Sequence, residues 1–405
     1  MPKETKLDTP NASIWKRFFR DGFAIAGFLI IAISMLIAIL GYWICPDSTP
    51  NANNMHIQYS IKKPGTIYSL LFIRKKKRVD TLSLWGKLIS GQPSFYEEYP
   101  INSYKIFGDS IQINEFTGVS SDSLETRSFH LAEVVYPLKG KINKISDHYQ
   151  FQDIYGVKIL ANRKDLIATI QEKNLVHRRY ILGTDLYGRD LLSRLILGSR
   201  ISISVGLMAV IISLSLGVLL GSLAGFYRGW VDECISWLIN VVWSLPALLL
   251  VIAISLSLGK GIWQIFVAVG LTMWVEVARM VRGQVFSMRE AEFIEAGKAL
   301  GMSNFRLITK HILPNIGGPI LVVGASNFAS AILLEAGLSF LGFGAQPPFP
   351  SWGSMIKENY GYIIIDAAFL ALIPGLAIMI VVYGFNLLSV GLRDSYDVRD
   401  RNTMI

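Results

Sequence analysis

The amino-acid sequence predicts an all-α polytopic membrane protein with six transmembrane helices and a small, β-leaning insertion between the first two. Of the 405 residues, 52% are hydrophobic and only 17% are charged, which is too apolar for an ordinary soluble protein. Six apolar runs are each long enough to cross a bilayer, which takes about 20 residues. The stretch after the first run is polar and contains short alternating segments, so we expect it to fold outside the membrane.

The expected spans divide the chain. Residues 1–22 form a cytoplasmic N-terminal tail, residues 23–44 the first transmembrane helix, and residues 45–180 the insertion. The first run is longer than a signal-peptide core and no small-residue cleavage site follows it, so we expect it to remain as an anchor. Residues 181–405 form the remaining membrane domain, with helices expected at about 201–227, 234–258, 262–281, 316–341 and 362–392. We expect a kink in the last helix at Pro374 and Gly375.

Basic residues predict the orientation of these helices. Six spans place both termini on one side, where Lys16, Arg20 and Arg393 flank the first and last spans. The segment between the fourth and fifth spans lies on the same side and is also rich in lysine and arginine. Short cytoplasmic loops carry an excess of these residues, so both termini are predicted to be cytoplasmic and the insertion extracytoplasmic. The basic run IRKKKR at 73–78 does not oppose this, because the rule does not hold for long loops.

The insertion shows mixed local signals. TIYSLLFI, SIQINEF and LAEVVYPL are β-like runs, at residues 66–73, 110–116 and 131–138. YGVKILANRKDLIATIQEK, from residue 155, reads as a strand followed by a helix, with Asn162 as the N-cap. No motif in this segment carries chemistry.

Two polar loops are expected at the outer surface. The first contains two short corners and leads through an amphipathic helix into the second span; its residues are Gly183, Thr184, Asp185, Gly188, Arg189 and Asp190. The local role expected of these corners is helix capping by Asp185 and an Asp190–Arg194 pair; a role beyond this stays open. The second loop follows the fifth span and is stiffened by prolines; its notable residues are Pro347, Pro348, Trp352 and Gly353, with Trp352 expected as an interfacial anchor.

A polar cassette of two short helices separates the fourth and fifth spans. In FIEAGKALGMSNFRLITKHILPN, residues 293–315, an apolar face is expected from Phe293, Ala296, Gly297 and Leu300. Gly301 follows as a helix stop, Ser303 is expected to cap the second helix, and Pro314 to limit its length. The second helix is expected to carry an apolar stripe of Phe305, Ile308 and Ile312 and a basic one of Arg306 and Lys310.

These stretches resemble one family. Glu295, Ala296 and Gly297, then Gly301, then Leu313 and Pro314 resemble the signature (EAA) loop of permease subunits of binding-protein-dependent ABC importers. LGTDLYGRD at 182–190 and LSFLGFGAQPPFPSWG at 338–353 look like marks of the dipeptide/oligopeptide (peptide/nickel) subfamily, second-permease type. The resemblance covers about residues 16–42 and 179–397. Gly297 stands where the general pattern has alanine, His311 where it has isoleucine, and the insertion is longer than is usual.

The resemblance implies a six-helix type I ABC importer fold in a bacterial cytoplasmic (inner) membrane. It implies import of di- or oligopeptides with four kinds of partner: a homologous permease, two ABC ATPases, an extracytoplasmic substrate-binding protein and the lipid bilayer. It further implies that the cassette couples the permease to the ATPase. Glu295 would be the anchoring carboxylate, Ala296, Gly297 and Gly301 would allow close approach, and Leu313 and Pro314 would set the exit angle into the fifth span.

Catalysis is not expected in this chain. It contains no Gly-x4-Gly-Lys-Ser/Thr phosphate loop, so ATP and magnesium are expected on partner ATPases, and no cofactor or catalytic residue on this subunit. The five histidines show no metal-ligand spacing, so no metal site is expected. Helix, glycine turn and basic helix also describe a DNA-binding motif, but apolar spans on both sides of the cassette argue against nucleic acid.

Two alternatives stay open. The same kind of permease could carry another cargo, such as a nickel chelate, glutathione or an antimicrobial peptide. A membrane-anchored enzyme or channel would need a catalytic constellation in the insertion or a charged path through the spans. The charges within spans are few: Glu276 and Arg279, expected to pair, Glu335, and Asp366. They are too scattered for a proton relay.

Overall fold

The chain divides into two units in the computed structural model, which describes residues 15–118, 126–259, 261–364 and 366–396. The helical unit comprises residues 1–39, 198–363 and 368–405, and the second unit comprises residues 40–197 and 364–367. Helices α2 (Gly22–Ile44) and α6 (Leu191–Tyr227) contribute to both. Most of the expected N-terminal tail (1–14) and the last nine residues, 397–405, lie outside the described residues.

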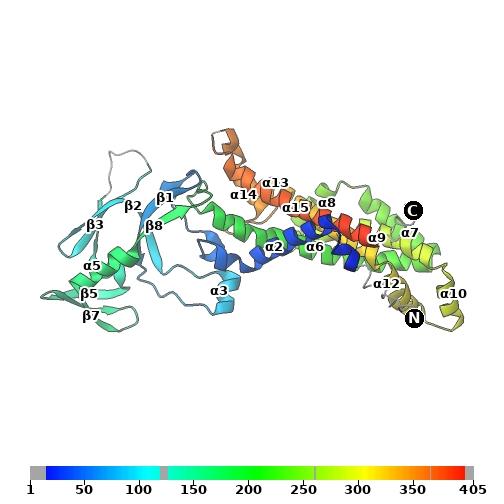
Figure 1. The fold of residues 1–405 in the computed structure, drawn as a ribbon, viewed down its shortest axis with the longest axis horizontal. Helices are drawn as coiled ribbons and strands as arrows, with labels where there is room; N and C mark the ends of the chain where they lie inside the picture. The colour runs from blue at the N-terminus through cyan, green and yellow to red at the C-terminus, as the bar shows by residue number, and fades with distance from the viewer. Residues whose placement is uncertain (1–14, 119–125, 260, 365, 397–405) are drawn as a thin grey trace, which may run out of the picture. The chain divides into compact units, whose positions relative to one another are not determined.

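Five described helices are long and apolar enough to cross a membrane. They are α2, α6, α9 (Ile262–Met288), α13 (Gly317–Leu341) and α15 (Phe369–Tyr396). Figure 1 shows α6, α9, α13 and α15 running alongside one another. Helix α6 joins the expected amphipathic lead-in to the span, giving 37 residues or about 55 Å. Helix α15 starts later than expected and continues through Pro374, after α14 (Trp352–Asn359) and a 3-10 turn at Tyr360–Ile364.

The expected span at 234–258 is not one continuous helix. The structure has two helices there, α7 (Gly229–Trp243) and α8 (Ala247–Leu258), bent by 95° from each other. Pro246 immediately precedes α8, and proline both lacks an amide hydrogen and disfavours the helical conformation in the residue before it. The six expected spans are therefore five continuous helices and one broken pair in the part of the chain that the structure describes.

Glycines bring α6 and α9 into close contact. Gly217, Gly221 and Gly225 recur every four residues on α6, so they lie on one face. A Cβ atom at Gly221 would lie 2.5 Å from the carbonyl oxygen of Ala278, and one at Gly225 2.7 Å from that of Arg282. Between α2 and α15, a Cβ at Gly27 would lie 2.7 Å from the carbonyl oxygen of Gly384. Membrane helices pack through such small residues because lipid offers no hydrophobic driving force between them.

The second unit contains two antiparallel sheets. The larger has the order β4-β3-β2-β1-β8 and the smaller β5-β6-β7. Their strands are β1 (Thr66–Arg74), β2 (Tyr96–Phe107), β3 (Ser110–Glu115), β4 (Thr126–His130), β8 (Leu175–Tyr180), β5 (Leu138–Ile145), β6 (His148–Asp153) and β7 (Lys158–Asn162). The helices are α3 (Leu84–Ser90), α4 (Leu131–Val135) and α5 (Arg163–Thr169).

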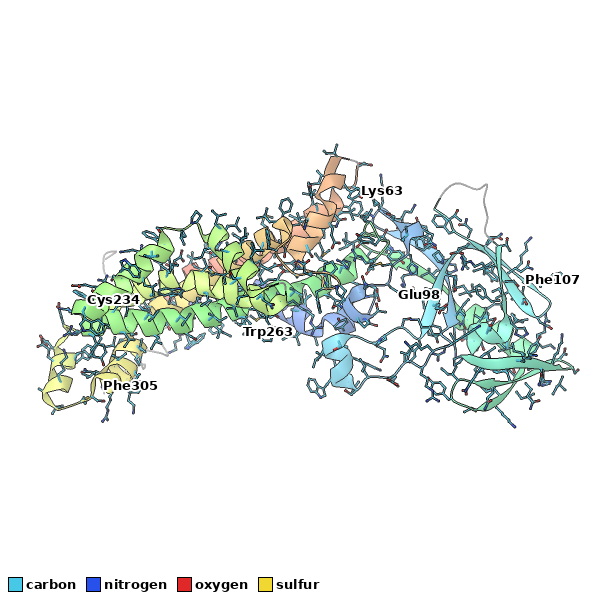
Figure 2. The ribbon with its side chains drawn as sticks, turned by 180° about the vertical axis from the view of Figure 1, so that it is seen from behind. Lys63, Glu98, Phe107, Cys234, Trp263 and Phe305 are labelled. Atoms are coloured by element: carbon cyan, nitrogen blue, oxygen red, sulfur yellow. The ribbon has the colours of Figure 1, made fainter. Side chains whose placement is uncertain are left out.

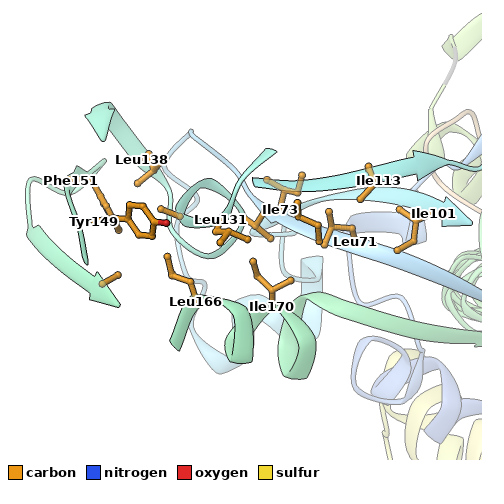
Figure 3. Packing of buried hydrophobic residues seen from close by; sticks show 14 residues of the cluster. Leu71, Ile73, Ile101, Ile113, Leu131, Leu138, Tyr149, Phe151, Leu166 and Ile170 are labelled. Carbon is orange, nitrogen blue, oxygen red and sulfur yellow. The ribbon is translucent and has the colours of Figure 1, made fainter. Parts of the chain in front are cut away.

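The local expectations for this unit are partly met. TIYSLLFI and SIQINEF form β1 and β3, and Asn162 caps α5 by accepting a hydrogen bond from the amide of Lys164. LAEVVYPL is not a strand: its first five residues form α4, whose N-cap is the His130 side chain. Buried Leu131 and Val134 of α4 lie in one core with residues of both sheets and of α5 (Figure 3). Helix α4 therefore joins the two sheets.

Glu98 ties three segments of the second unit together. Its carboxylate lies 3.0 Å from Nη1 of Arg178 on β8, 3.1 Å from Nε2 of His56 and 2.7 Å from Nδ2 of Asn54. Its side chain, labelled in Figure 2, is 5% exposed. Burial acts to raise the pKa of Glu98, but the hydrogen bond with His56 and the charge on Arg178 outweigh burial and hold that pKa below its ordinary value. The ionised form of Glu98 therefore stabilises the native second unit.

We predict that the second unit loses stability in acid through Glu98. Because the native pKa is depressed, the contribution is present above the unfolded pKa of about 4.3 and is lost as the pH falls through the native pKa. Glu98→Gln leaves Arg178 without its buried partner and should destabilise the unit by about 3 kcal/mol at pH 7. Hydrogen exchange of β1, β2 and β8 amides in the full chain measures this.

Glu97→Gln is the matched control, because Glu97 is the exposed neighbour of Glu98 on the same strand. Equal exchange rates in the two variants at neutral pH would contradict the prediction.

Candidate functional site

The loop between α9 and α13 is a compact element with its own turn and cap. It contains α10 (Glu292–Ala299), α11 (Asn304–Arg306), a π-helical segment Leu307–Ile312 and α12 (Leu313–Asn315). Gly301 has φ +76°, a left-handed conformation that suits glycine, and its amide bonds to the carbonyl of Lys298 at 2.9 Å. Ser303 caps the second helix by accepting a hydrogen bond from the amide of Arg306. We call residues 290–316 the docking loop.

The apolar faces of the docking loop differ from the sequence prediction. On α10 the buried residues are Ile294 and Gly297, whereas Phe293 is 46% and Leu300 77% exposed. On the second helical segment Leu307, Ile308 and Ile312 are buried, but Phe305 is 76% exposed (labelled in Figure 2). The helical stretch that begins at Asn304 ends at Asn315, one residue after Pro314. Phe293, Leu300 and Phe305, expected in the apolar stripes, thus lie on the exposed side of the loop, whereas Ile308 and Ile312 of the second stripe are buried.

A small core fixes the docking loop to the membrane helices. Ile294, Leu307 and Ile312 pack in one cluster with Val281 and Val285 of α9, and Phe226 of α6 belongs to it. A Cβ at Gly297 would lie 2.8 Å from Cδ2 of Leu307, so this glycine lets the two arms of the loop approach each other. The loop is thus a rigid extension of α9.

The remaining predicted loop residues lie on its outside. Glu295, Ala296 and Pro314 are exposed, Gly301 is exposed with open space around it, and Leu313 is half-buried. Together with Phe293, Leu300 and Phe305 they make a mixed apolar and charged surface, to which Arg306 and Lys310 add positive charge. Large apolar side chains exposed on a polar loop mark an interaction surface.

Ion pairs at the base of the loop were not anticipated. Arg282 of α9 makes a two-pronged contact with Asp232 of α7, at 2.5 and 2.7 Å. Arg228 lies 2.5 Å from Glu290 and stacks on the Phe286 ring at 3.9 Å from its centroid. Opposite charges at the ends of successive apolar runs were the signal that could have suggested such pairs.

The loop at 182–190 is built into the second unit. The Asp185 carboxylate lies 2.6 Å from Nε of Arg189 and accepts hydrogen bonds from the amides of Tyr187 and Arg189. The hydroxyl of Thr184 donates to the carbonyl of Tyr59 and accepts from the amide of Lys62. A Cβ at Gly188, which has φ +70°, would overlap the carbonyl of His56. A Cβ at Gly183 would likewise overlap the carbonyl of Lys62.

Asp190, not Asp185, caps α6. Its carboxylate accepts hydrogen bonds from the amide and the hydroxyl of Ser193. Asp185, Arg189 and Asp190 are all buried, so this loop holds residues 56–63 against the start of α6 within the second unit.

The loop at 342–359 also packs inward. Pro347 and Pro348 are joined by a cis peptide bond, and Trp352, expected at the bilayer interface, is instead 3% exposed. A Cβ at Gly198 would touch the Trp352 ring, and one at Gly353 would lie 2.6 Å from Cα of Ala336. These contacts hold α14 close against α6 and α13.

Glu335 lies beneath this loop and is completely buried. Its carboxylate accepts hydrogen bonds from Ser339 at 2.6 Å and Ser202 at 3.1 Å, and Ser351 in turn contacts Ser339 at 3.2 Å. This serine cluster links α6, α13 and the N-cap of α14. The Glu335 carboxylate is therefore part of the packing between these three helices.

A cavity of about 660 Å³ opens at the bend between α7 and α8. Its wall is mostly apolar, from residues such as Leu248 and Met273, and among the described residues that line it Glu276 carries the one charge. Arg279 stacks on Trp243 at 3.5 Å from the ring centroid, instead of pairing with Glu276 in the described part of the chain. Across the described residues no three His, Cys, Asp or Glu side chains gather to hold a metal ion.

We predict that Gly188 tolerates no side chain. Gly188→Ala adds a clash with the His56 carbonyl to the strain of a positive φ, for a total of about 2–5 kcal/mol. Gly65→Ala is the control, because Gly65 has φ +84° but open space around it, and should cost about 1–2 kcal/mol. Faster proteolysis of the second unit in Gly188→Ala than in Gly65→Ala measures the difference, and equal rates would refute it.

Two family models match the chain. One, described as a binding-protein-dependent transport system inner membrane component, matches residues 217–399. The other, described as the N-terminal TM domain of oligopeptide transport permease C, matches residues 9–62.

Several transport permeases are similar to about half of this chain. The dipeptide transport system permease protein DppC of Alkalihalophilus pseudofirmus is 44% identical over 215 residues, which is 53% of this chain and 70% of that protein. The glutathione transport system permease protein GsiD of Pectobacterium atrosepticum is 39% identical over 216 residues (53% and 71%). The oligopeptide transport system permease protein OppC of Bacillus subtilis is 39% identical over 219 residues (54% and 72%). A solved inward-facing MetNI methionine ABC transporter aligns with TM-score 0.43 at 18% identity, over 51% of this chain and 98% of that one.

Proposed function

Because the chain belongs to the family of inner membrane components of binding-protein-dependent transport systems, a family of multi-pass transport subunits, we propose that it imports di- or oligopeptides. Support for this cargo comes from the printed names of the relatives, which include dipeptide and oligopeptide permeases. Glutathione is the alternative cargo, because the glutathione permease GsiD is 39% identical. A nickel chelate or an antimicrobial peptide fits the same kind of permease.

The docking loop is the proposed contact with a cytoplasmic ATPase. Its inner face is filled by Ile294, Leu307 and Ile312, so the exposed Phe293, Leu300 and Phe305 have no core of their own to join. A partner that closes on this surface would pull on α9 through the Val281 and Val285 contacts. Rigid coupling of this kind is what alternating access of a transporter needs.

The other assignments follow from this role. ATP and magnesium bind to two partner ATPases, and this subunit carries no catalytic residue, cofactor or resident metal. A homologous permease completes the pathway, and an extracytoplasmic substrate-binding protein delivers the cargo. Both termini and the docking loop face the cytoplasm, and the second unit lies outside, as the distribution of basic residues supports.

We predict opposite accessibility for the two units. In a Cys234→Ser background, Lys164→Cys on the second unit should react with a membrane-impermeant maleimide in intact, outer-membrane-permeabilised cells. Lys298→Cys on the docking loop should react only after the inner membrane is opened. Both native positions are exposed in the structure, so burial does not confuse the result. Reaction of both from the outside would overturn the proposed topology.

We predict that Glu295→Lys uncouples transport. The change places a cation where the loop offers an exposed anion to its partner. Loss of a charge-assisted contact costs about 1.5–3 kcal/mol, so peptide uptake should fall at least about tenfold. Uptake of a labelled dipeptide and co-purification of the ATPase are measured together, with membrane insertion checked by expression level. Glu172→Lys, the same change at an exposed site of the second unit, is the control and should transport normally.

Two substitutions at Gly301 separate the effect of added charge on partner binding from the effect of added volume. Asn and Asp both tolerate the positive φ found there, and open space surrounds this glycine. Gly301→Asp should therefore impair ATPase binding more than Gly301→Asn. Normal uptake and normal co-purification in both Glu295→Lys and Gly301→Asp would show that the docking loop is a passive surface.

A further inference from the structure

Helix α3 of the second unit exposes a continuous apolar face. Trp85 and Ile89 are four residues apart, so they lie on one side of the helix, and Leu82 immediately precedes the N-cap Ser83. Their exposed fractions are 36%, 74% and 64%, and the neighbouring Leu84 is 73% exposed. No residue of α3 is buried. A short helix with such a face requires an apolar environment outside the second unit.

Helix α3 is attached to the end of the first transmembrane helix. Gly91, its C-cap, has φ +74°, and a Cβ there would lie 2.6 Å from the ring of Tyr42 in the last turn of α2. The next amide, of Gln92, donates to the carbonyl of Ser48 at 3.0 Å. Figure 1 shows α3 beside the C-terminal end of α2.

Polar contacts fix the segment that carries the apolar face. The side chain of Gln92 accepts a hydrogen bond from the amide of Leu82 at 3.1 Å and donates to the carbonyl of Asp80 at 3.0 Å. Ser83 caps the helix by accepting from the amide of Gly86 at 3.2 Å. Both ends of the segment are therefore held by one residue that is itself bonded beside the end of α2.

The length of α2 places this attachment at the membrane boundary. Its 23 residues rise about 35 Å, against a hydrocarbon thickness of about 30 Å, so Tyr42 lies at the edge of the acyl chains. The seven residues of α3 extend about 10 Å from Gly91, which is comparable with the headgroup layer. Trp43 and Ile44, 60% and 49% exposed, continue the apolar surface at the end of α2.

We propose that α3 is an interfacial membrane helix. Leu82, Leu84, Trp85 and Ile89 insert into the boundary between headgroups and acyl chains of the leaflet at the C-terminal end of α2. Tryptophan prefers this depth, and a helix with one apolar face lies in the plane of the interface. The phospholipid surface is thus a second attachment for the second unit, besides its covalent links to α2 and α6. The proposal needs α2 to span the bilayer and is independent of cargo and ATPase.

The test compares two equally exposed aromatic positions in the full chain, reconstituted in phospholipid nanodiscs. Spin labels are attached to Trp85→Cys and Phe107→Cys in a Cys234→Ser background, in which Cys45 remains buried. Phe107 is 76% exposed at the tip of the β2–β3 hairpin (Figure 2), so it is the water-exposed control. Collision of each label with oxygen, which partitions into lipid, and with a water-soluble nickel chelate is measured.

Relative to the label at 107, the label at 85 should show several-fold less collision with the nickel chelate and more collision with oxygen. Equal chelate collision at both positions would place α3 in water and overturn the proposal. Protection of the label at 85 from both reagents would overturn it as well, because a protein surface would then cover the helix. Ile89→Cys should follow Trp85→Cys, since both lie on the same face.

Discussion

The close contact between α6 and α9 determines where the docking loop lies. Gly217, Gly221 and Gly225 remove the side chains that would otherwise separate the two helices. The C-terminal end of α9 then packs with Phe226 of α6, and the docking loop adds Ile294 and Ile312 to the same cluster. Because packing in lipid relies on such close approach, a side chain at any of these glycines would displace the loop as well as the helix.

The docking loop works as a two-sided element. One side is an apolar core in which Gly297 and Leu307 meet, and it packs the loop onto α9. The other side shows Phe293, Leu300 and Phe305 to solvent, a costly arrangement for a free protein. Salt bridges at its base, including Arg282 with Asp232, tie the broken third span to α9. The loop is thereby connected to both α7 and α9.

Local sequence signals predicted the spans, caps and turns well. They predicted poorly the features that depend on contacts between distant parts of the chain. Spans, the Ser303 and Asn162 caps and the Gly301 turn follow from residues within a few positions of one another. The faces of the docking-loop helices could not be assigned, because periodicity finds an apolar stripe but cannot say whether Ile294 or Phe293 meets the protein's own core. The break before Pro246 was hidden inside an apolar run of ordinary span length, and α4 was hidden because its valines favour strands in general.

The loops that resemble family marks make internal contacts in this chain. Thr184, Asp185 and Gly188 contact residues 56–63 within the second unit. Trp352 and Gly353 are buried against α6 and α13. These two loops therefore position the start of α6 and the start of α14.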